Sequence, residues 1–396
     1  MNPSLSLARV QRPCQACGST SATRLYDNRL ASIDGMDLSY CVVVCDSCGF
    51  AYATDLAPSA TYETYYHSCS KYDTAQTLDY VSNVERERAL HALKLCLPIF
   101  ETDSAVLDLG CGHGVLLNEF RVSGFTQSWG LDPAQNAPAI ARRLFAIEGV
   151  RTGMLRESER HFDLASIRLF CLTAVLEHLP ECCSDMTWLT ERMSEGSHLL
   201  VEVPALERFC RPPFEPFGEF SLEHVNYFSA ATLDRLLRRT GLSLVQMSYL
   251  GLEAGSTDSL FALYRKGRRT VASQKHSLEM GDLGRYIAES KSMLDAALEK
   301  LDRLRDKPCI IYGAGSHTAR LIPHLANKGL NRNILFVVDS NPNLQGKTMS
   351  SLPIYAPQKI SEHPEAQIIV STFRAQHAIA TALAAGFSNR SVLLYP

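Results

Sequence analysis

The chain has 396 residues, of which 46% are hydrophobic and 20% are charged, as is typical of a globular protein with a sizeable core. The formal net charge of −3 offers no basic field that would attract nucleic acid or an anionic membrane. No apolar run approaches the roughly 20 residues that span a bilayer, and the first residues lack the apolar core of a secretory signal. We therefore expect a cytoplasmic protein of two or three domains.

Two Cys-x-x-Cys pairs, each followed by glycine, lie near the N-terminus. They are formed by Cys14 with Cys17 and by Cys45 with Cys48. This spacing predicts a tetrahedral zinc site, and it is structural because the protein fills all four positions. Four free or redox-active thiols are the alternative, and Cys41, outside both pairs, is a possible substitute ligand.

A tyrosine-rich stretch follows, with Tyr62, Tyr65, Tyr66 and Tyr72 and with His67 beside them. Exposed aromatic rings with hydroxyls would suit a lid over a polar ligand. The alternative is that they dock the cysteine-containing module, assigned here to residues 1–75, onto the next domain.

Residues 76–270 alternate between helical and strand patterns. We predict helices at 79–97, 115–123, 137–145 and 186–193, strands at 105–109, 128–131, 169–172 and 198–203, and a hairpin of strands at 242–251 and 259–265. Strands that alternate with helices at this spacing predict a doubly wound parallel sheet in an α/β protein.

A glycine-rich turn follows the first predicted strand of this region. The strand carries Asp108, and Gly110, Gly112 and Gly114 open the next helix. Glycines at the carboxyl end of a parallel strand let the backbone approach a cofactor. Asp132 ends the next strand about 20 residues later, where a carboxylate holds ribose hydroxyls. Together with the Val-Leu-Glu-His-Leu segment at 175–179, these residues resemble the S-adenosylmethionine (SAM) site of class I methyltransferases.

Methyl transfer from a sulfonium requires a base for the acceptor rather than an acid for the donor. Two Glu-His pairs are candidates: Glu177 with His178 after the strand at 169–172, and Glu223 with His224 after the strand at 198–203. Loops at strand ends are where open α/β sheets place substrates, which favours His224. Each histidine taken alone is more typical of a packing or hydrogen-bonding role than of a catalytic one. Ser229, beyond the second pair, resembles a helix N-cap.

The last part of the chain predicts a connecting helix within residues 271–306 and a small βαβ domain at 307–396. A second glycine turn, with Gly313 and Gly315, follows a strand there, and Asp339 ends the next strand. Only two glycines are present, so binding of a dinucleotide at this turn is weakly supported.

The order of these parts resembles the sugar C-methyltransferases that act on nucleotide-linked ketosugars. It comprises zinc knuckles, a SAM core with Glu-His-Leu and Glu-His-Val-Asn-Tyr-Phe-Ser segments, and a Rossmann-like C-terminal domain. The resemblance covers nearly the whole chain. It implies that the outer domains flank the SAM core and that a nucleotide-sugar lies in the cleft between them.

The same resemblance implies roles for individual residues. His224, paired with Glu223, becomes the base that removes a proton α to a ketone, and His178 matches the family's earlier histidine. A tyrosine of the 62–66 stretch would contribute a hydroxyl to the sugar. This chain departs from the family in carrying Ser221 where a tyrosine often stands two residues before the Glu-His pair.

Other functions stay open at this point. The acceptor atom is carbon in the first hypothesis, and oxygen or nitrogen of a sugar or other small metabolite in the second. An RNA-binding methyltransferase is disfavoured by the acidic balance, because the basic clusters at 235–239 and 266–269 are short. A non-catalytic SAM- or nucleotide-sensing protein is disfavoured by the intact motifs at Asp108 and Asp132.

Overall fold

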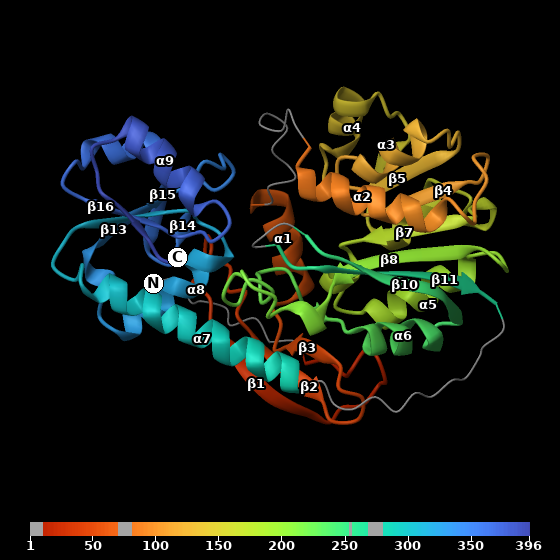
Figure 1. Ribbon diagram of the computed structural model, residues 1–396, viewed down its shortest axis with the longest axis horizontal. Helices are drawn as coiled ribbons and strands as arrows, with labels where there is room; N and C mark the ends of the chain where they lie inside the picture. The colour runs from red at the N-terminus through yellow and green to blue at the C-terminus, as the bar shows by residue number, and fades with distance from the viewer. Residues whose placement is uncertain (1–10, 70–80, 253–255, 268–279) are drawn as a thin grey trace.

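A computed structural model describes residues 11–69, 81–252, 256–267 and 280–396 (Figure 1). The chain forms three sheets of four, seven and six strands in the described residues. The six-stranded sheet lies on one side of the molecule and the seven-stranded sheet on the other, with the N-terminal strands between them (Figure 1). No described helix is both long enough and apolar enough to cross a membrane.

The four-stranded sheet combines residues that are far apart in the sequence. Its order is β1 (Ala22–Asn28), β2 (Tyr40–Cys45), β3 (Ala51–Thr54) and β9 (Asn226–Tyr227), all antiparallel. In β9, Asn226 pairs with Tyr52 of β3. The loop that contains His224 is therefore fastened to the N-terminal sheet, although the strand patterns of residues 76–270 predicted no such strand.

Helix α1 (Ser59–Cys69) carries part of the tyrosine-rich stretch. Tyr62 and Tyr65 are each only 9% exposed and belong to the hydrophobic core that surrounds the N-terminal sheet. Both rings are therefore buried rather than exposed, as the docking alternative requires, but Tyr62 also borders the cleft between the domains, so both alternatives stay open. Tyr72 lies outside the described residues.

The seven-stranded sheet has the order β10-β11-β8-β7-β4-β5-β6. Its strands are β4 (Val106–Leu109), β5 (Ser128–Asp132), β6 (Val150–Thr152), β7 (Leu169–Thr173), β8 (His198–Pro204), β10 (Leu242–Leu250) and β11 (Ser259–Lys266). The helices are α2 (Asn83–Cys96), α3 (Val115–Val122), α4 (Ala137–Phe145), α5 (Cys182–Arg192) and α6 (Ala230–Arg239). Strands β4 to β8 are parallel and β10 and β11 form an antiparallel hairpin, which confirms the predicted α/β architecture.

Two local features of this domain differ from the prediction. Strand β6 was not predicted, because it is short and has little periodicity. Helix α5 begins at Cys182 rather than at residue 186. Strand β7 begins at Leu169 as predicted, after a short 3-10 helix (Leu164–Ser166) that Asp163 caps by accepting the Ala165 N–H.

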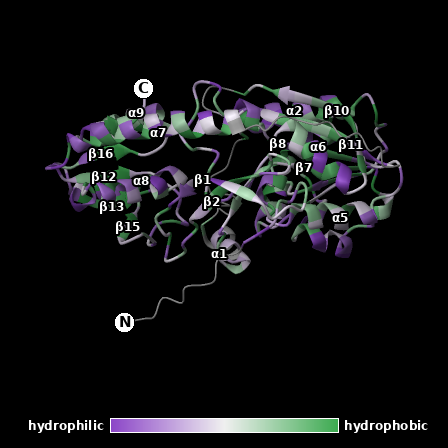
Figure 2. Cartoon of the chain, turned by 90° about the horizontal axis from the view of Figure 1, so that it is seen from below, coloured by the Kyte–Doolittle hydropathy of each residue, from purple (hydrophilic) through white to green (hydrophobic). Residues whose placement is uncertain are grey.

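The C-terminal sheet has the order β14-β15-β13-β12-β16-β17. Its elements are β12 (Cys309–Tyr312), α8 (Ser316–Asn327), β13 (Ile334–Val338), β14 (Thr348–Met349), β15 (Leu352–Tyr355), β16 (Gln367–Val370), α9 (Gln376–Gly386) and β17 (Ser391–Leu393). All pairs are parallel except β14 with β15. The strands are largely hydrophobic, whereas the helices carry both hydrophilic and hydrophobic residues (Figure 2).

Helix α7 (Met280–Asp302) runs from beside the N-terminal strands to the C-terminal sheet (Figure 1). Its Tyr286 packs against Phe209 and Phe220 near the N-terminal sheet, and Lys300 at its other end donates to the carbonyl of Leu394. The Ala31 N–H also donates to Ala319 of α8 at 2.6 Å. The C-terminal domain is thus docked onto the N-terminal module.

Candidate active site

One cleft of about 1460 Å³ is bordered by all three parts of the chain. It receives the carboxyl ends of strands β4, β5, β7 and β8, Tyr62 of α1, the loop 215–225 and the turn after β12. Ligand pockets usually measure about 300–1,000 Å³, so this cleft has room for a cofactor and a second ligand together.

The first glycine turn is held by the strand beside it. Gly110 N–H donates to the Leu131 carbonyl at 2.7 Å, and Gly112 N–H donates to Asp132 Oδ2 at 2.7 Å. A Cβ on Gly110 would lie 2.3 Å from Val175 Cγ2, whereas a Cβ on Gly112 would meet no atom within 4 Å. Gly110 is therefore required by packing, and Gly112 faces open space that suits a ligand.

Asp108 is an unusual carboxylate below this turn. It is 1% exposed, and neither of its carboxylate oxygens has a hydrogen-bond partner among the residues that the structure describes. Burial, together with the charge of Asp132, raises the pKa of Asp108 to about 8. A buried, unsatisfied carboxylate is costly, and a cationic ligand with N–H donors would relieve that cost.

A cluster of acids and imidazoles lies in the same cleft. One carboxylate oxygen of Glu177 and one ring nitrogen each of His178 and His224 lie within 4.8 Å of one another. The two imidazole rings meet edge to face, with their centroids 4.9 Å apart. Glu177 is 1% exposed, and burial raises its pKa to about 7. The structure thus brings together the two Glu-His segments, which are separated by more than forty residues.

Each histidine has its own acidic neighbour. His178 Nδ1 lies 4.0 Å from Glu223 Oε2, and His224 Nδ1 lies 3.6 Å from Glu219 Oε2. Burial by itself would lower the pKa of His224, but the carboxylates of Glu219, Glu177 and Glu223 raise it above its usual value. Glu223 is therefore nearer to His178 than to the imidazole that follows it in the chain.

Two buried polar side chains hold the histidine loops together. Asn226 Nδ2 donates to the carbonyls of Leu176 and Leu179 at 2.9 and 2.8 Å. Arg12 is 6% exposed and donates to Asn226 Oδ1 at 2.7 Å and to the carbonyl of Pro180. Both loops are thus fixed by a residue that precedes the first cysteine pair.

Sequence reasoning did not identify Glu219, Arg12 or Asn226 as site residues. Glu219 precedes His224 by five positions and belongs to no recognisable motif. A basic residue near a Cys-x-x-Cys pair is equally uninformative. For Asn226 a signal was available, because it belongs to the Glu-His-Val-Asn segment, but that segment did not indicate its role.

The sequence of residues 80–247 matches the family described as "Methyltransferase domain". This range contains the first glycine turn, Asp108, Asp132 and both histidines. The chain is a SAM-dependent methyltransferase. The match confirms the methyltransferase part of the resemblance drawn from the sequence. No curated protein matches the sequence significantly.

Solved structures with a similar core include several methyltransferases. One is a SAM-dependent methyltransferase from Mesorhizobium loti, with 15% identity, TM-score 0.36, and coverage of 44% of this chain and 96% of that one. Another is the N-methyltransferase NodS from Bradyrhizobium japonicum in complex with S-adenosylhomocysteine, with 18% identity, TM-score 0.37, and coverage of 52% and 97%. A third is a possible histamine N-methyltransferase from Thermotoga maritima, with 15% identity, TM-score 0.36, and coverage of 53% and 96%.

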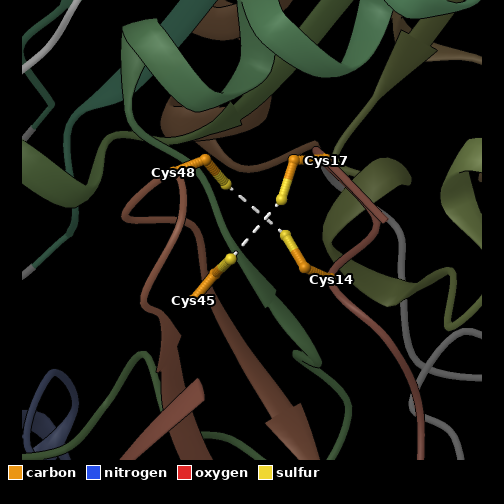
Figure 3. Close-up of side chains that lie close together, drawn as sticks. All are labelled: Cys14, Cys17, Cys45 and Cys48. Atoms are coloured by element: carbon orange, nitrogen blue, oxygen red, sulfur yellow. Dashed lines mark hydrogen bonds between the residues drawn. The ribbon is translucent and has the colours of Figure 1, made fainter. Parts of the chain in front are cut away.

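The four predicted metal ligands of the methyltransferase point to a common centre (Figure 3). The sulfurs of Cys14 and Cys48 are 3.5 Å apart, as are those of Cys17 and Cys45, and all four lie within 4.8 Å of one another. The Gly18 N–H donates to the Cys14 carbonyl at 2.7 Å and the Gly49 N–H to the Cys45 carbonyl at 2.9 Å. Four thiols at this spacing fit a tetrahedral zinc ion with sulfur ligands at about 2.3 Å.

The second glycine turn of the methyltransferase also opens into the cleft. Its Gly313 N–H donates to the Val338 carbonyl at 2.8 Å, and its Ala314 N–H donates to Asp339 Oδ2 at 2.6 Å. Helix α8 begins directly after the turn, so its N-terminal end faces the space that the first turn shares.

Proposed function

We propose that this methyltransferase transfers a methyl group to carbon of a nucleotide-linked ketosugar, with His224 as the base. The observation that carries the proposal is the position of the His224 imidazole, in the same cleft as the cofactor turn and surrounded by carboxylates. An imidazole can accept a proton and return it to solvent, and the carboxylates that raise the pKa of His224 make it a stronger base.

Five residues would hold SAM. Asp108 would neutralise the positive charge of the cofactor, Gly110, Gly112 and Gly114 would let the backbone approach it, and Asp132 would accept from its ribose. The unsatisfied oxygens of Asp108 and the open space at Gly112 fit such a ligand. When bound, SAM supplies an electrophilic methyl group.

The chain's own residues supply the proton transfer. His224 removes the proton α to the ketone, and the C–H electron pair becomes an enolate. The enolate carbon would take the methyl group that bound SAM supplies, and the electron pair of the broken sulfur–methyl bond would stay with the neutral thioether. Glu223 would orient the sugar, and His178 would donate a hydrogen bond to the enolate oxygen, because both residues border the same part of the cleft.

The nucleotide part of the acceptor would occupy the remainder of the cleft. The cleft extends from the first glycine turn to Gly313 and Gly315, and its volume exceeds the need of one cofactor. We assign the end of the cleft at Gly313 and Gly315 to a Rossmann-like domain that closes over the acceptor.

We also propose that Cys14, Cys17, Cys45 and Cys48 bind a structural zinc ion. Elemental analysis of the purified enzyme is expected to find about one zinc per chain. The double substitution Cys14→Ser with Cys48→Ser should lose it, whereas Cys41→Ser should retain it. Zinc retained by the double variant would contradict the ligand set.

The acceptor is tested by calorimetric titration of the enzyme, saturated with S-adenosylhomocysteine, against dTDP-, GDP- and UDP-sugars. We expect binding of one class, and NMR of the methylated product is expected to show the new methyl group on carbon. Binding to none of them, or a methyl group on oxygen or nitrogen, would overturn the sugar C-methylation proposal.

The base is tested by His224→Ala, with the nucleotide-sugar selected by that titration. This variant should still bind S-adenosylhomocysteine but lose turnover by about 10²–10⁴-fold, the usual contribution of a general base. Normal turnover would show that His224 is not the base.

A further inference from the structure

We infer that Glu219 is a positioning residue for His224. Its carboxylate lies beside Nδ1 of the imidazole and favours the tautomer with the proton on that nitrogen, which leaves Nε2 unprotonated and free to accept the proton of the acceptor. This inference rests on the proposed role of His224 as the base.

The first support is the pairing itself. Glu219 is 6% exposed, and its Oε2 lies 3.6 Å from Nδ1 of His224. Hydrogen bonds between a base and its orienting group are often long in structures without substrate and shorten in the reactive complex. A buried carboxylate beside an imidazole nitrogen strongly favours the tautomer with the proton on that nitrogen.

The second support is that the other carboxylate oxygen is already engaged. Thr257 donates its hydroxyl to Oε1 of Glu219. This contact fixes the plane of the carboxylate and directs Oε2 toward His224. Arg374 of the C-terminal domain adds a positive charge near Glu219, which helps to keep the carboxylate ionised.

The third support is that the two partners have separate backbone anchors. The Glu219 N–H donates to the Tyr286 hydroxyl of α7 at 2.9 Å. The His224 N–H donates to Ser221 Oγ at 3.0 Å, and Tyr227 donates its hydroxyl to the His224 carbonyl at 3.1 Å. Ser221 thus shapes the turn at the position where the resembled family often has a tyrosine.

Other titratable groups also surround the imidazole, and they do not occupy the same role. The groups that face it from its own loop and from the packed elements are Glu219, Glu223, Glu177 and His178. Glu223 is 4.0 Å from His178, and Glu177 is likewise 4.0 Å from His178 Nε2. Among the described residues, Glu219 is therefore the acid that lies beside Nδ1 of His224.

The proton balance follows directly. The acceptor's proton moves to Nε2 of His224, and the imidazolium that forms keeps its Nδ1–H bond to Glu219, which stays ionised. The carboxylate therefore stabilises the charge that develops on His224 during proton transfer. Removing that charge should lower both the basicity of His224 and the rate.

The test is nitrogen NMR of the whole enzyme with S-adenosylhomocysteine bound, with the His224 signals assigned from the spectrum of His224→Gln. The neutral imidazole is expected to carry its proton on Nδ1, and Glu219→Gln is expected to lower the pKa of His224. A proton on Nε2, or an unchanged pKa, would overturn the inference without any measurement of turnover.

Turnover with the nucleotide-sugar found by titration provides the second readout. Glu219→Gln should lower kcat by about 10- to 100-fold while KM changes by less than about 3-fold. The acidic limb of the pH–rate profile should move to lower pH, because a base of lower pKa stays neutral at lower pH. Glu219→Asp should restore part of kcat.

A matched control is Glu207→Gln. Glu207 is a partly buried glutamate that caps α6 through the Ala230 N–H at 2.7 Å and does not border the cleft. The Glu207→Gln variant should leave kcat and the pH–rate profile unchanged.

The variants at the site separate the two proposals. If His224→Ala is inactive but Glu219→Gln behaves as wild type, the positioning role of Glu219 is wrong and His224 remains the base. If His224→Ala is active, the proposed function itself fails.

Discussion

The two glycine turns of this methyltransferase share one backbone design but differ in the side chain beneath it. In both, a glycine N–H donates to the last apolar residue of the neighbouring strand, and an aspartate after that residue accepts a second amide of the turn. The contacts are 2.7 and 2.7 Å at the first turn and 2.8 and 2.6 Å at the second. The difference lies two residues before the first glycine, where Asp108 stands in one strand and Ile311 in the other.

We expect that difference to affect which charge each turn favours. Asp108 places a buried carboxylate beneath the first turn, which favours a cationic ligand there. Ile311 places no charge at the matching position, although Asp339 accepts the Ala314 N–H beside the second turn. The shared backbone geometry therefore leaves the charge preference to the side chains around each turn.

The largest expected effect comes from Gly110→Ala, compared with Gly315→Ala. Gly110 has φ +85°, and a Cβ would lie 2.3 Å from Val175 Cγ2, whereas a Cβ on Gly315 meets no atom within 4 Å. We expect Gly110→Ala to lower the free energy of unfolding by about 2–4 kcal/mol from strain and overpacking. Scanning calorimetry of both variants measures this, and equal losses would show that the turns are not packed differently.

Next is Asp108→Asn, compared with Asp339→Asn. At about pH 9, where Asp108 is ionised, loss of its carboxylate should weaken binding of cationic SAM by about 10-fold or more, equivalent to about 1.4 kcal/mol per factor of ten. Asp339→Asn should change that affinity by less than about 2-fold, because this carboxylate serves only the second turn. Calorimetric titration decides, and the comparison fails if the two variants weaken binding equally.

A smaller effect is the pH dependence of the first turn. Burial raises the pKa of Asp108 to about 8 in the folded protein, so its contribution to stability is present at acidic pH and is lost as pH rises toward 8. The affinity for cationic SAM should rise over the same range by up to about 10-fold per pH unit as the carboxylate ionises. Melting temperatures and titrations between about pH 6 and 9 test both trends. Asp108→Asn should flatten them, and trends that persist in this variant would assign them to another group.

The smallest effect is expected from Ile311→Val, which removes one buried methyl group from the second strand. It should cost about 0.5–1.5 kcal/mol of stability and leave S-adenosylhomocysteine affinity unchanged. Thermal unfolding and the same titration are sufficient. A change in cofactor affinity would mean that the second turn is coupled to the first.

Features that depend on neighbouring residues were predictable from the sequence. They are the cysteine pairs, both glycine turns, the alternating strands and the connecting helix. A turn needs glycine at a few adjacent positions, and a parallel sheet leaves strand and helix periodicities in the chain. Strand β9 and the contact of Glu219 with His224 were not predictable. A two-residue strand has no periodicity, and a lone glutamate has no motif.

Only the tertiary structure decided which of these parts meet. It brought Glu177 and His178 next to His224, it tied both loops to Arg12, and it opened the two glycine turns into one cleft. Contacts between residues so far apart in the chain depend on how whole domains pack, which no local pattern records. The sequence by itself determined a methyltransferase core with a cofactor turn, and the packing of three sheets determined the surroundings of its histidines.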